Sequence, residues 1–246
     1  MTTLVKCRGW MIIACVGTGI AMAVWATPSA EDAMPKAPAY RPPTSAALKL
    51  RVDGHVRGTD DAALTLTVLA PEHVGLTTKE QPSLYWFQSK AVNTRFELTI
   101  TERKAVKPLL EARLEVPSGG TQRLRLSDYK VSLAEGVEYR WSVAMVVDPD
   151  NRSSDVVASG VIKRVKPTET LLRRLKSAPA ADIPYIYAEE GIWYDSLETL
   201  SELVDARPQD ARLHEIRAIY FMQVGLHDAA MNEMRLAGKT VESPTR

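Results

Sequence analysis

The sequence predicts an α+β protein in which an antiparallel β-sandwich is followed by a set of α-helical hairpins. Three observations predict this fold class. Apolar and polar residues alternate with a period of two in about seven short segments between residues 51 and 166. The periodicity becomes helical after Pro167. Two glycines that end helical segments, Gly191 and Gly225, stand 34 residues apart. The 246 residues, 45% of them hydrophobic, suffice for two ordinary domains.

The first 26 residues have the pattern of a cleaved signal peptide. Lys6 and Arg8 form a short basic region, and an uncharged apolar run ends at Ala26. We therefore expect export, with a periplasmic or secreted mature protein. An uncleaved membrane anchor is the alternative, although the run is shorter than the roughly 20 residues that a spanning helix needs. A lipoprotein is less favoured, because the apolar stretch before Cys15 is too short.

Residues 27–50 are rich in proline and alanine, and five prolines fall between residues 28 and 43. Proline removes a backbone donor and favours extended conformations over packed secondary structure. We expect this stretch to be a disordered linker between the leader and the first domain.

The β-sandwich domain is expected over residues 51–166. Representative strands are "ALTLTVL", "RFELTIT" and "VEYRWSVAMVV", each with apolar side chains on one face. Turn-rich segments separate the strands, and no helical crossover lies between them. Neighbouring strands are therefore expected to run antiparallel.

One short stretch of this domain favours a particular topology. In "LAEGVEYRW", Tyr139 enters a late strand and Trp141 follows on the same face. The stretch resembles the tyrosine corner, in which the tyrosine hydroxyl bonds to the backbone just upstream. It favours an immunoglobulin-like or fibronectin-III-like sandwich, in which both residues have structural roles.

The helical part is expected over residues 167–238, before a disordered tail at 239–246. A first helix can begin at a Thr168 or Thr170 cap, and two helical pairs follow. Their 34-residue spacing and the order of aromatic, small and helix-ending residues resemble tetratricopeptide repeats. The residues given structural roles by this register are Tyr187, Gly191, Trp193, Pro208 and Gly225. Because two hairpins rarely stand alone, they should pack on the sandwich, on another copy or on a partner.

Composition excludes several classes of site. Both cysteines, Cys7 and Cys15, lie in the leader, so the mature chain has no thiol chemistry. The four histidines have no metal-ligand spacing, and no phosphate or dinucleotide loop occurs. Removing Lys6 and Arg8 leaves 29 basic and 30 acidic residues, which gives no electrostatic footprint for nucleic acid. We expect no metal, no cofactor and no nucleic acid partner.

The stretch "DPDNRSSD", residues 148–155, resembles a calcium loop weakly. Arg152 and Ser153 occupy positions where that loop wants an oxygen ligand and a glycine, and Ser159 replaces the closing glutamate. A polar hairpin turn is favoured.

A cluster of carboxylates and aromatics in "YAEEGIWYD" raises a hydrolase as an alternative. Glycoside hydrolysis needs two carboxylates across a cleft. Glu189 and Glu190 are adjacent on a helix, so their side chains diverge by about 100°. Asp195 suits the first turn of the next helix, where a carboxylate meets the positive helix end. We therefore favour packing and solvated charge over catalysis.

Four blocks of sequence together resemble a bacterial domain-of-unknown-function family, number 928, over about residues 51–225. The blocks are "LAPEHVGLTTKEQPSLYWFQS", "YRWSV", "GVIKRV" and "YAEEGIWYDSLETLSEL". The matching positions are Pro71, Gly75, Leu76, Thr77, Pro82, Tyr139, Trp141, Gly160, Ile162, Arg164, Tyr187, Gly191, Trp193, Tyr194 and Asp195. The chain departs from the family at Val161, where an aromatic is common. The resemblance implies export and a two-part architecture, and it brings no activity and no catalytic residue.

The expected function is that of an exported, non-enzymatic adaptor with an envelope protein as partner. In tetratricopeptide arrays the first helix of each pair lines the concave face. By register, the expected partner contacts are Tyr185, Glu189, Arg212, Glu215, Ile219 and Met222. The alternative is a carbohydrate or envelope-polymer binding module that uses sandwich loops and whichever of Tyr85 and Trp86 is exposed. The sequence leaves the oligomeric state open.

Overall fold

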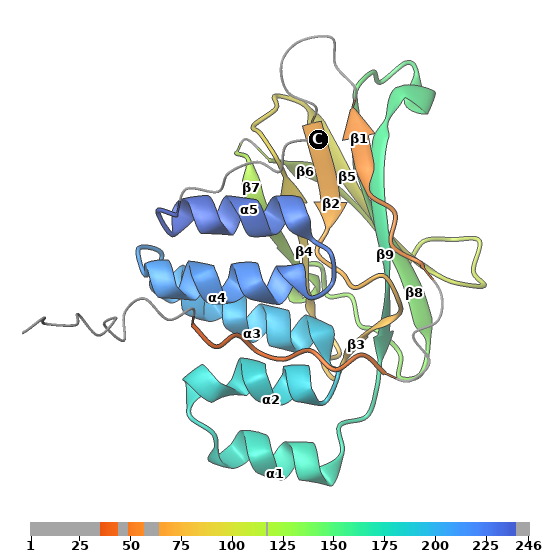
Figure 1. The fold of residues 1–246 in the computed structure, drawn as a ribbon. Coiled ribbons are helices and arrows are strands. Elements are labelled where there is room, and N and C mark those ends of the chain that lie inside the picture. The colour runs from red at the N-terminus through yellow and green to blue at the C-terminus, as the bar shows by residue number, and fades with distance from the viewer. Residues whose placement is uncertain (1–34, 44–48, 57–63, 117, 240–246) are drawn as a thin grey trace, which may run out of the picture. The chain divides into compact units, whose positions relative to one another are not determined.

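The computed structural model describes residues 35–43, 49–56, 64–116 and 118–239. The expectations for the leader, for residues 27–34 and 44–48 of the linker, and for the tail after residue 239 lie outside these ranges. Met34–Arg246 form one compact unit. Within its described residues are two β-sheets and five α-helices (Figure 1), so the protein is of the mixed α and β class.

The smaller sheet has four antiparallel strands in the order β1-β2-β4-β7. Their bounds are β1 Gly54–Val56, β2 Leu64–Val68, β4 Ser83–Gln88 and β7 Gly120–Arg125. β4 lies between β2 and β7, and all six of its residues are buried. A strand that is buried on both faces must be covered on both sides.

The larger sheet has five strands in the order β3-β9-β8-β5-β6. Their bounds are β3 Gly75–Thr77, β5 Arg95–Glu102, β6 Leu110–Glu115, β8 Glu138–Met145 and β9 Val156–Arg164. β3 pairs with β9 in parallel, with Gly75 opposite Ile162. The expectation of antiparallel pairing throughout is therefore wrong at this edge. β3 is too short to show a period of two, and its partner lies far along the chain, so no adjacent crossover marks the parallel pair.

The two sheets face each other across an apolar core. β5 alternates buried and half-buried residues, and β8 follows a similar pattern. Leu66 and Trp86 of the smaller sheet and Leu98, Trp141 and Val143 of the larger sheet are all fully buried or nearly so. This alternation follows from the pleat, which sends successive side chains to opposite faces.

The helices follow in chain order after β9. Their bounds are α1 Glu169–Ser177, α2 Ile183–Glu189, α3 Trp193–Ala206, α4 Ala211–Met222 and α5 His227–Leu236. The side chain of Thr168 accepts a hydrogen bond from the amide of Leu171 and caps α1. The helices break at Gly191, Pro208 and Gly225, as predicted, and both glycines have left-handed backbones with φ of 73° and 72°.

α3 and α5 cover the outer face of the smaller sheet (Figure 1). Ser83 of β4 donates its hydroxyl to Glu198 of α3 at 3.0 Å, and Arg123 of β7 pairs with Asp205 at 3.0 Å. One continuous apolar core includes residues of both sheets and of α3, α4 and α5. Three packing partners were considered for the helical hairpins, and the sandwich is therefore one on which they pack.

Residues 35–43 differ from the disordered linker expected over 27–50. They run in an extended form across the helices (Figure 1), and Pro35 and Pro38 are buried. Proline content argues against helix and sheet, but it does not prevent an extended segment from packing in a groove made by other residues. We refer to residues 35–43 as the N-terminal strap.

Candidate functional site

The three carboxylates of the "YAEEGIWYD" stretch do not face a common space. Glu189 and Glu190, at the end of α2, both accept hydrogen bonds from the guanidinium of Arg174 on α1, at 2.5 and 2.9 Å. The hydrogen bond from Arg174 lowers the pKa of the Glu189 carboxyl. Asp195 lies on α3 and is completely buried. These residues do not form the facing pair of carboxylates that the hydrolase alternative requires.

Asp195 connects α3 to the short strand β3. Its carboxylate accepts hydrogen bonds from the hydroxyl of Thr77 and from both the hydroxyl and the amide of Thr78, the amide at 2.9 Å. Burial raises the pKa of Asp195, while the three donors act in the opposite direction. The sequence placed Asp195 correctly on the first helical turn, but it did not indicate that the side chain is buried against a strand.

The neighbouring Tyr194 connects α3 to both β8 and β9. The indole nitrogen of Trp141 donates to the Tyr194 hydroxyl at 2.9 Å, and that hydroxyl donates to the carbonyl of Val161 at 3.2 Å. A Cβ atom at Gly75 would lie 2.5 Å from the Tyr194 ring, so only glycine fits there. All four blocks that carry the family resemblance contribute to this contact, which we call the α3 joint.

Trp193 completes the α3 joint. Its ring stacks on Tyr220 of α4 with centroids 4.6 Å apart, and its indole nitrogen donates to the carbonyl of Leu69 at 2.9 Å. Trp193 therefore links α3 to α4 and to the sheets. Its predicted structural role was limited to a single helical hairpin. Tyr187 packs in a smaller apolar cluster with Leu171 and Ile192.

Of three other residues with predicted structural roles, Tyr139 lies at the start of β8, and Pro208 and Gly225 lie at turns between helices. The hydroxyl of Tyr139 accepts a hydrogen bond from the amide of Ala134, five residues upstream, at 3.2 Å. The carbonyl oxygen of Pro208 lies 3.0 Å from the ring of His214. The carbonyl of Gly225 accepts a hydrogen bond from Arg51 at 3.3 Å.

A groove runs between α2 and α4, and the N-terminal strap lies in it. The hydroxyl of Tyr185 on α2 donates to the carbonyl of Lys36 at 2.7 Å. The side-chain amide of Gln223, just after α4, donates to the carbonyl of Pro38 at 2.7 Å. Both contacts reach the backbone of the strap, so they do not depend on its side chains.

The far end of the strap is held in the same way. The backbone amide of Tyr40 donates to the side-chain oxygen of Gln223 at 2.8 Å, and the amide of Arg41 donates to the carbonyl of Ala188 at 3.0 Å. A Cβ atom at Gly191 would lie 2.7 Å from the carbonyl oxygen of Arg41. Gly191 therefore makes the turn between α2 and α3 and also leaves room for the strap.

The ring of Tyr40 fills an aromatic pocket at this end. It makes edge-to-face contacts with Trp193 and Tyr220, with centroids 5.1 and 6.4 Å apart, and it stacks on His73 at 5.8 Å. Its hydroxyl lies 2.9 Å from Nε2 of His73. Burial raises the pKa of Tyr40 and lowers the pKa of His73. Both shifts favour the neutral forms of the two side chains, which can share one hydrogen bond.

The other end of the groove, near Lys36, opens into a cavity of about 730 Å³ between α1, α2 and α4. Its polar lining residues are Lys36, Arg174, Ser177, Asp182, Tyr185, Glu189 and Arg212. Tyr185, Glu189 and Arg212 are three of the six contacts expected from the sequence. The structure brings these three together.

The other three expected contacts lie along α4 outside this cavity. Glu215 pairs with Lys239 at 3.4 Å, Ile219 is half-buried, and Met222 is 41% exposed. They continue the same side of α4 because positions three and four apart share a helix face.

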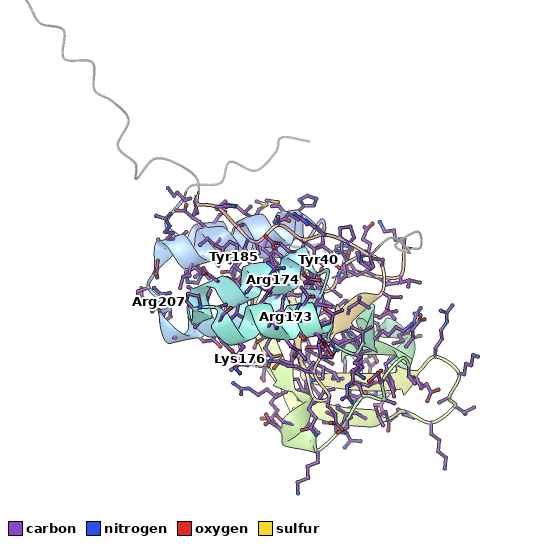
Figure 2. All side chains as sticks on the ribbon, turned by 90° about the horizontal axis from the view of Figure 1, so that it is seen from below. Tyr40, Arg173, Arg174, Lys176, Tyr185 and Arg207 are labelled. Carbon is purple, nitrogen blue, oxygen red and sulfur yellow. The ribbon has the colours of Figure 1, made fainter. Side chains whose placement is uncertain are left out.

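Figure 2 shows the basic side chains Arg173, Arg174 and Lys176 over α1, with Tyr185 and Tyr40 in the same view. Arg174 is neutralised by Glu189 and Glu190. Arg212 and Lys36 have no ion-pair partner in the part of the chain that the structure describes. The cavity thus combines a tyrosine with two cations that are free to pair.

A family model described as Domain of Unknown Function (DUF928) matches residues 52–234. The chain belongs to the DUF928 family. No curated protein matches it. Within the described residues of this DUF928 protein, no helix has the length and apolar character needed to cross a membrane.

Sequence reasoning missed the strap residues of this DUF928 protein. Tyr40 is the only aromatic residue between positions 27 and 50, in the stretch "PKAPAYRPP". A single large aromatic in a proline-rich stretch is a signal for an anchor residue, because it has apolar area to bury. Gln223 gave no such signal.

The residues proposed for glycan stacking are not exposed. Tyr85 and Trp86 are each 2% exposed, so neither is the exposed ring that the carbohydrate-binding alternative requires. They alternate on β4, and Ser83, on the same face as Tyr85, bonds to α3. The helices cover the Tyr85 face and the second sheet covers the Trp86 face, so neither ring can stack on a sugar.

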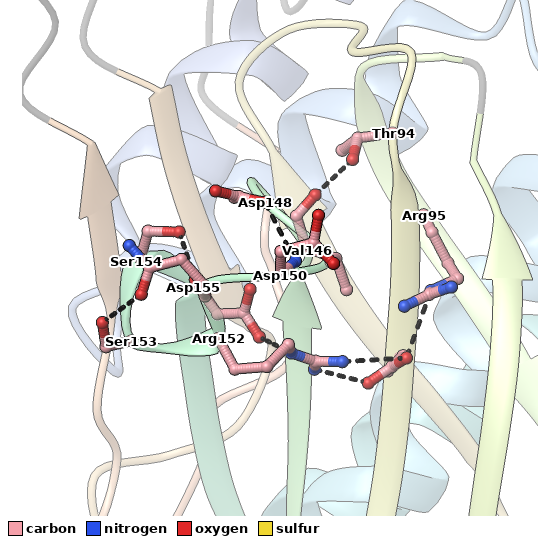
Figure 3. A network of polar contacts seen from close by, with 11 residues as sticks. Thr94, Arg95, Val146, Asp148, Asp150, Arg152, Ser153, Ser154 and Asp155 are labelled. Atoms are coloured by element: carbon pink, nitrogen blue, oxygen red, sulfur yellow. Dashed lines mark hydrogen bonds and ion pairs between the residues drawn. The ribbon is translucent and has the colours of Figure 1, made fainter.

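The "DPDNRSSD" stretch forms the turn between β8 and β9 (Figure 3). The guanidinium of Arg152 donates to Asp155 at 2.8 Å and to Glu97 of β5 at 2.6 Å. The carboxylate of Asp148 accepts from the amide of Asp150 at 2.9 Å. These bonds describe a polar hairpin turn. No group of three or more His, Cys, Asp or Glu residues in the described ranges is placed to hold a metal ion.

Proposed function

We propose that this DUF928 protein is an exported, non-enzymatic adaptor that binds an envelope protein through the α2–α4 groove and its cavity. The observation that carries the proposal is the strap itself. The groove holds an extended polypeptide through bonds from Tyr185 and Gln223 to the backbone. Beside it, a cavity of about 730 Å³ displays Tyr185 and Arg212. A surface with these features suits an extended segment of another protein.

The finer fold assignments are part of the same proposal. We assign the helices to the tetratricopeptide class because α2 and α4, the first helix of each pair, line the groove. The left-handed glycines at 191 and 225 also keep the 34-residue spacing. The hydroxyl bond of Tyr139 supports an immunoglobulin-like or fibronectin-III-like relationship for the sheets. The basic and apolar pattern of the leader supports export.

A non-enzymatic role is supported by how the carboxylates are used. Glu189 and Glu190 neutralise Arg174, and Asp195 and Glu198 bind strand and loop residues of the sheets. Each of these acids has a structural partner, which leaves none of them aimed at a substrate.

Site-specific photocrosslinking tests the proposal. A photoreactive phenylalanine replaces Arg212 in one full-length variant and Met222 in another, in cells that make the protein in its native envelope. A matched control places the same group at Val106, which is 97% exposed and lies between β5 and β6, away from the helices. We expect the same discrete adduct from both groove positions and none of that mass from Val106.

The adduct is then identified by mass spectrometry. Equal adducts from all three positions, or adducts from Val106 alone, would show that the groove is not the binding surface and would refute the proposal.

A further inference from the structure

The strap is bound in the way that a separate peptide ligand would be bound, because residues of the groove form hydrogen bonds to its backbone. Gln223 uses both ends of its side-chain amide, donating to the carbonyl of Pro38 and accepting from the amide of Tyr40. Tyr185 donates to the carbonyl of Lys36. An amide that bonds both a carbonyl and an N–H of the same chain selects an extended backbone.

The side chains that enter the groove define what else the site selects. Pro35 and Pro38 are buried, and the ring of Tyr40 lies in the pocket of Trp193, Tyr220 and His73. Proline suits such a site because it has no backbone N–H to leave unpaired and its extended form loses little entropy on binding. The two buried prolines and the half-buried tyrosine, whose ring contacts three aromatic side chains, define the pattern proline, two residues, proline, one residue, tyrosine.

Ala37 and Pro43 are half-buried, and the other four strap residues are presented to solvent. Lys36, Ala39, Arg41 and Pro42 are exposed, so their identity matters little for the groove. The groove thus has a defined recognition pattern, and the chain itself supplies one sequence that satisfies it.

We infer that the α2–α4 groove is a binding site for an extended proline-x-x-proline-x-aromatic segment of a partner protein, and that residues 35–43 occupy this site in cis. The inference rests on the proposed adaptor function and adds the chemical class of the ligand. The tethered strap acts at a high effective concentration, so a partner segment binds the wild-type protein only after displacing it. A ligand whose site is open only a fraction of the time binds with an affinity lowered by that fraction.

A labelled peptide tests the inference directly. A fluorescein-labelled peptide with the sequence of residues 35–43 is titrated with the full-length wild-type protein and with the full-length Pro38→Ala, Tyr40→Ala variant, and fluorescence anisotropy is measured. These substitutions weaken the strap and leave α2, α4 and Gln223 unchanged. We expect the variant to bind the peptide about tenfold more tightly than the wild type.

Two matched controls define the site. A peptide with alanine in place of its tyrosine should bind the variant about tenfold more weakly, since the aromatic pocket stays empty. Adding Gln223→Ala to the variant should weaken binding of the original peptide to a similar degree, about tenfold, because both backbone contacts are lost. Unlabelled peptide should also raise the melting temperature of the variant, as a ligand of the folded state must.

Several results would contradict the inference. A folded variant that does not bind the peptide, or a variant that no longer folds, would show that the strap is an integral part of the core, and either would overturn the inference. Binding accompanied by dimers that exchange their own straps would assign the site to a second copy instead. If groove adducts form in the envelope but the strap variant changes neither those adducts nor peptide binding, the adaptor proposal stands and this inference fails.

Discussion

The α3 joint and the α2–α4 groove are both built from aromatic and polar side chains, but they use them differently. In the joint, Trp193, Tyr194 and Asp195 are completely buried, and every polar atom described above for these side chains has a partner. In the groove, Tyr185 is half-buried and Arg212 and Gln223 are exposed.

The difference separates side chains that are fixed by burial and pairing from side chains that stay accessible. A buried polar group must be paired, so its neighbours are restricted to residues that supply the partner atoms. The α3 joint is therefore built from large aromatic and hydrogen-bonding side chains that few other residue types could replace. The groove makes its hydrogen bonds to the backbone of the strap, so its residue types are less restricted, and it is the surface proposed to bind a partner.

The largest expected effect comes from breaking the joint at Asp195. Asp195→Ala removes the acceptor of three hydrogen bonds and leaves the hydroxyl of Thr77 without its partner. We expect the free energy of unfolding to fall by about 3 kcal/mol, measured by urea denaturation. The control is Asp182→Ala, an exposed carboxylate in the groove cavity, which should change it by less than about 0.5 kcal/mol. Equal effects would mean that the joint and the groove are not energetically distinct.

A smaller, pH-dependent effect on stability is expected to have opposite signs at His214 and His73. His214, buried between helices, lies 2.7 Å from Glu233 and 3.0 Å from the carbonyl of Pro208, so both ring nitrogens face acceptors. The hydrogen bond to Glu233 raises the pKa of His214. Its contribution to stability is full below the unfolded pKa of about 6.5 and is lost as the pH rises through the higher folded pKa.

We therefore expect the melting temperatures of wild type and His214→Gln to converge as the pH rises from about 6.5 through the raised folded pKa of His214. His73, which stacks on Tyr40 of the strap, is the matched control. Burial lowers its pKa, so its effect has the opposite sign, and stability is lost as the pH falls from about 6.5 through the lower folded pKa of His73. A constant difference between wild type and His214→Gln across this range would contradict the assignment of an imidazolium at His214.

The smallest effect on stability is expected at Arg212. Its side chain has no ion-pair partner among the described residues, so Arg212→Ala should change the free energy of unfolding by less than about 0.5 kcal/mol. The same substitution should lower the yield of the adduct formed from the Met222 position by about threefold, since it removes a cation from the cavity. A stable variant with an unchanged adduct yield would place the partner elsewhere on α4.

Much of the fold could be predicted because its signals are local. The alternating strands and the helix breaks at Gly191, Pro208 and Gly225 each follow from residues within a few positions. β3 was missed because three residues carry no period. The burial of Asp195 was missed because it depends on Thr77 and Thr78, more than a hundred positions away.

The candidate site was only partly predictable for the same reason. Helical register placed Tyr185, Glu189 and Arg212 on one face, and they do line one cavity. The packing of the strap was not predicted, because a high proline content indicates only that a segment does not form a helix or a sheet by itself. Whether such a segment packs in a groove depends on a complementary surface that lies elsewhere in the chain.

The strap also has a consequence for the order of folding. It precedes every other described segment, yet the side chains that hold it come from α2 and the end of α4. The bond between Tyr40 and Gln223 joins residues 183 positions apart, and that between Pro38 and Gln223 joins residues 185 apart. Contacts between residues this far apart in the sequence form late, because the entropic cost of closing the chain must be overcome first. Of the described segments, the strap is thus the first to be synthesised, and it is expected to be among the last to dock.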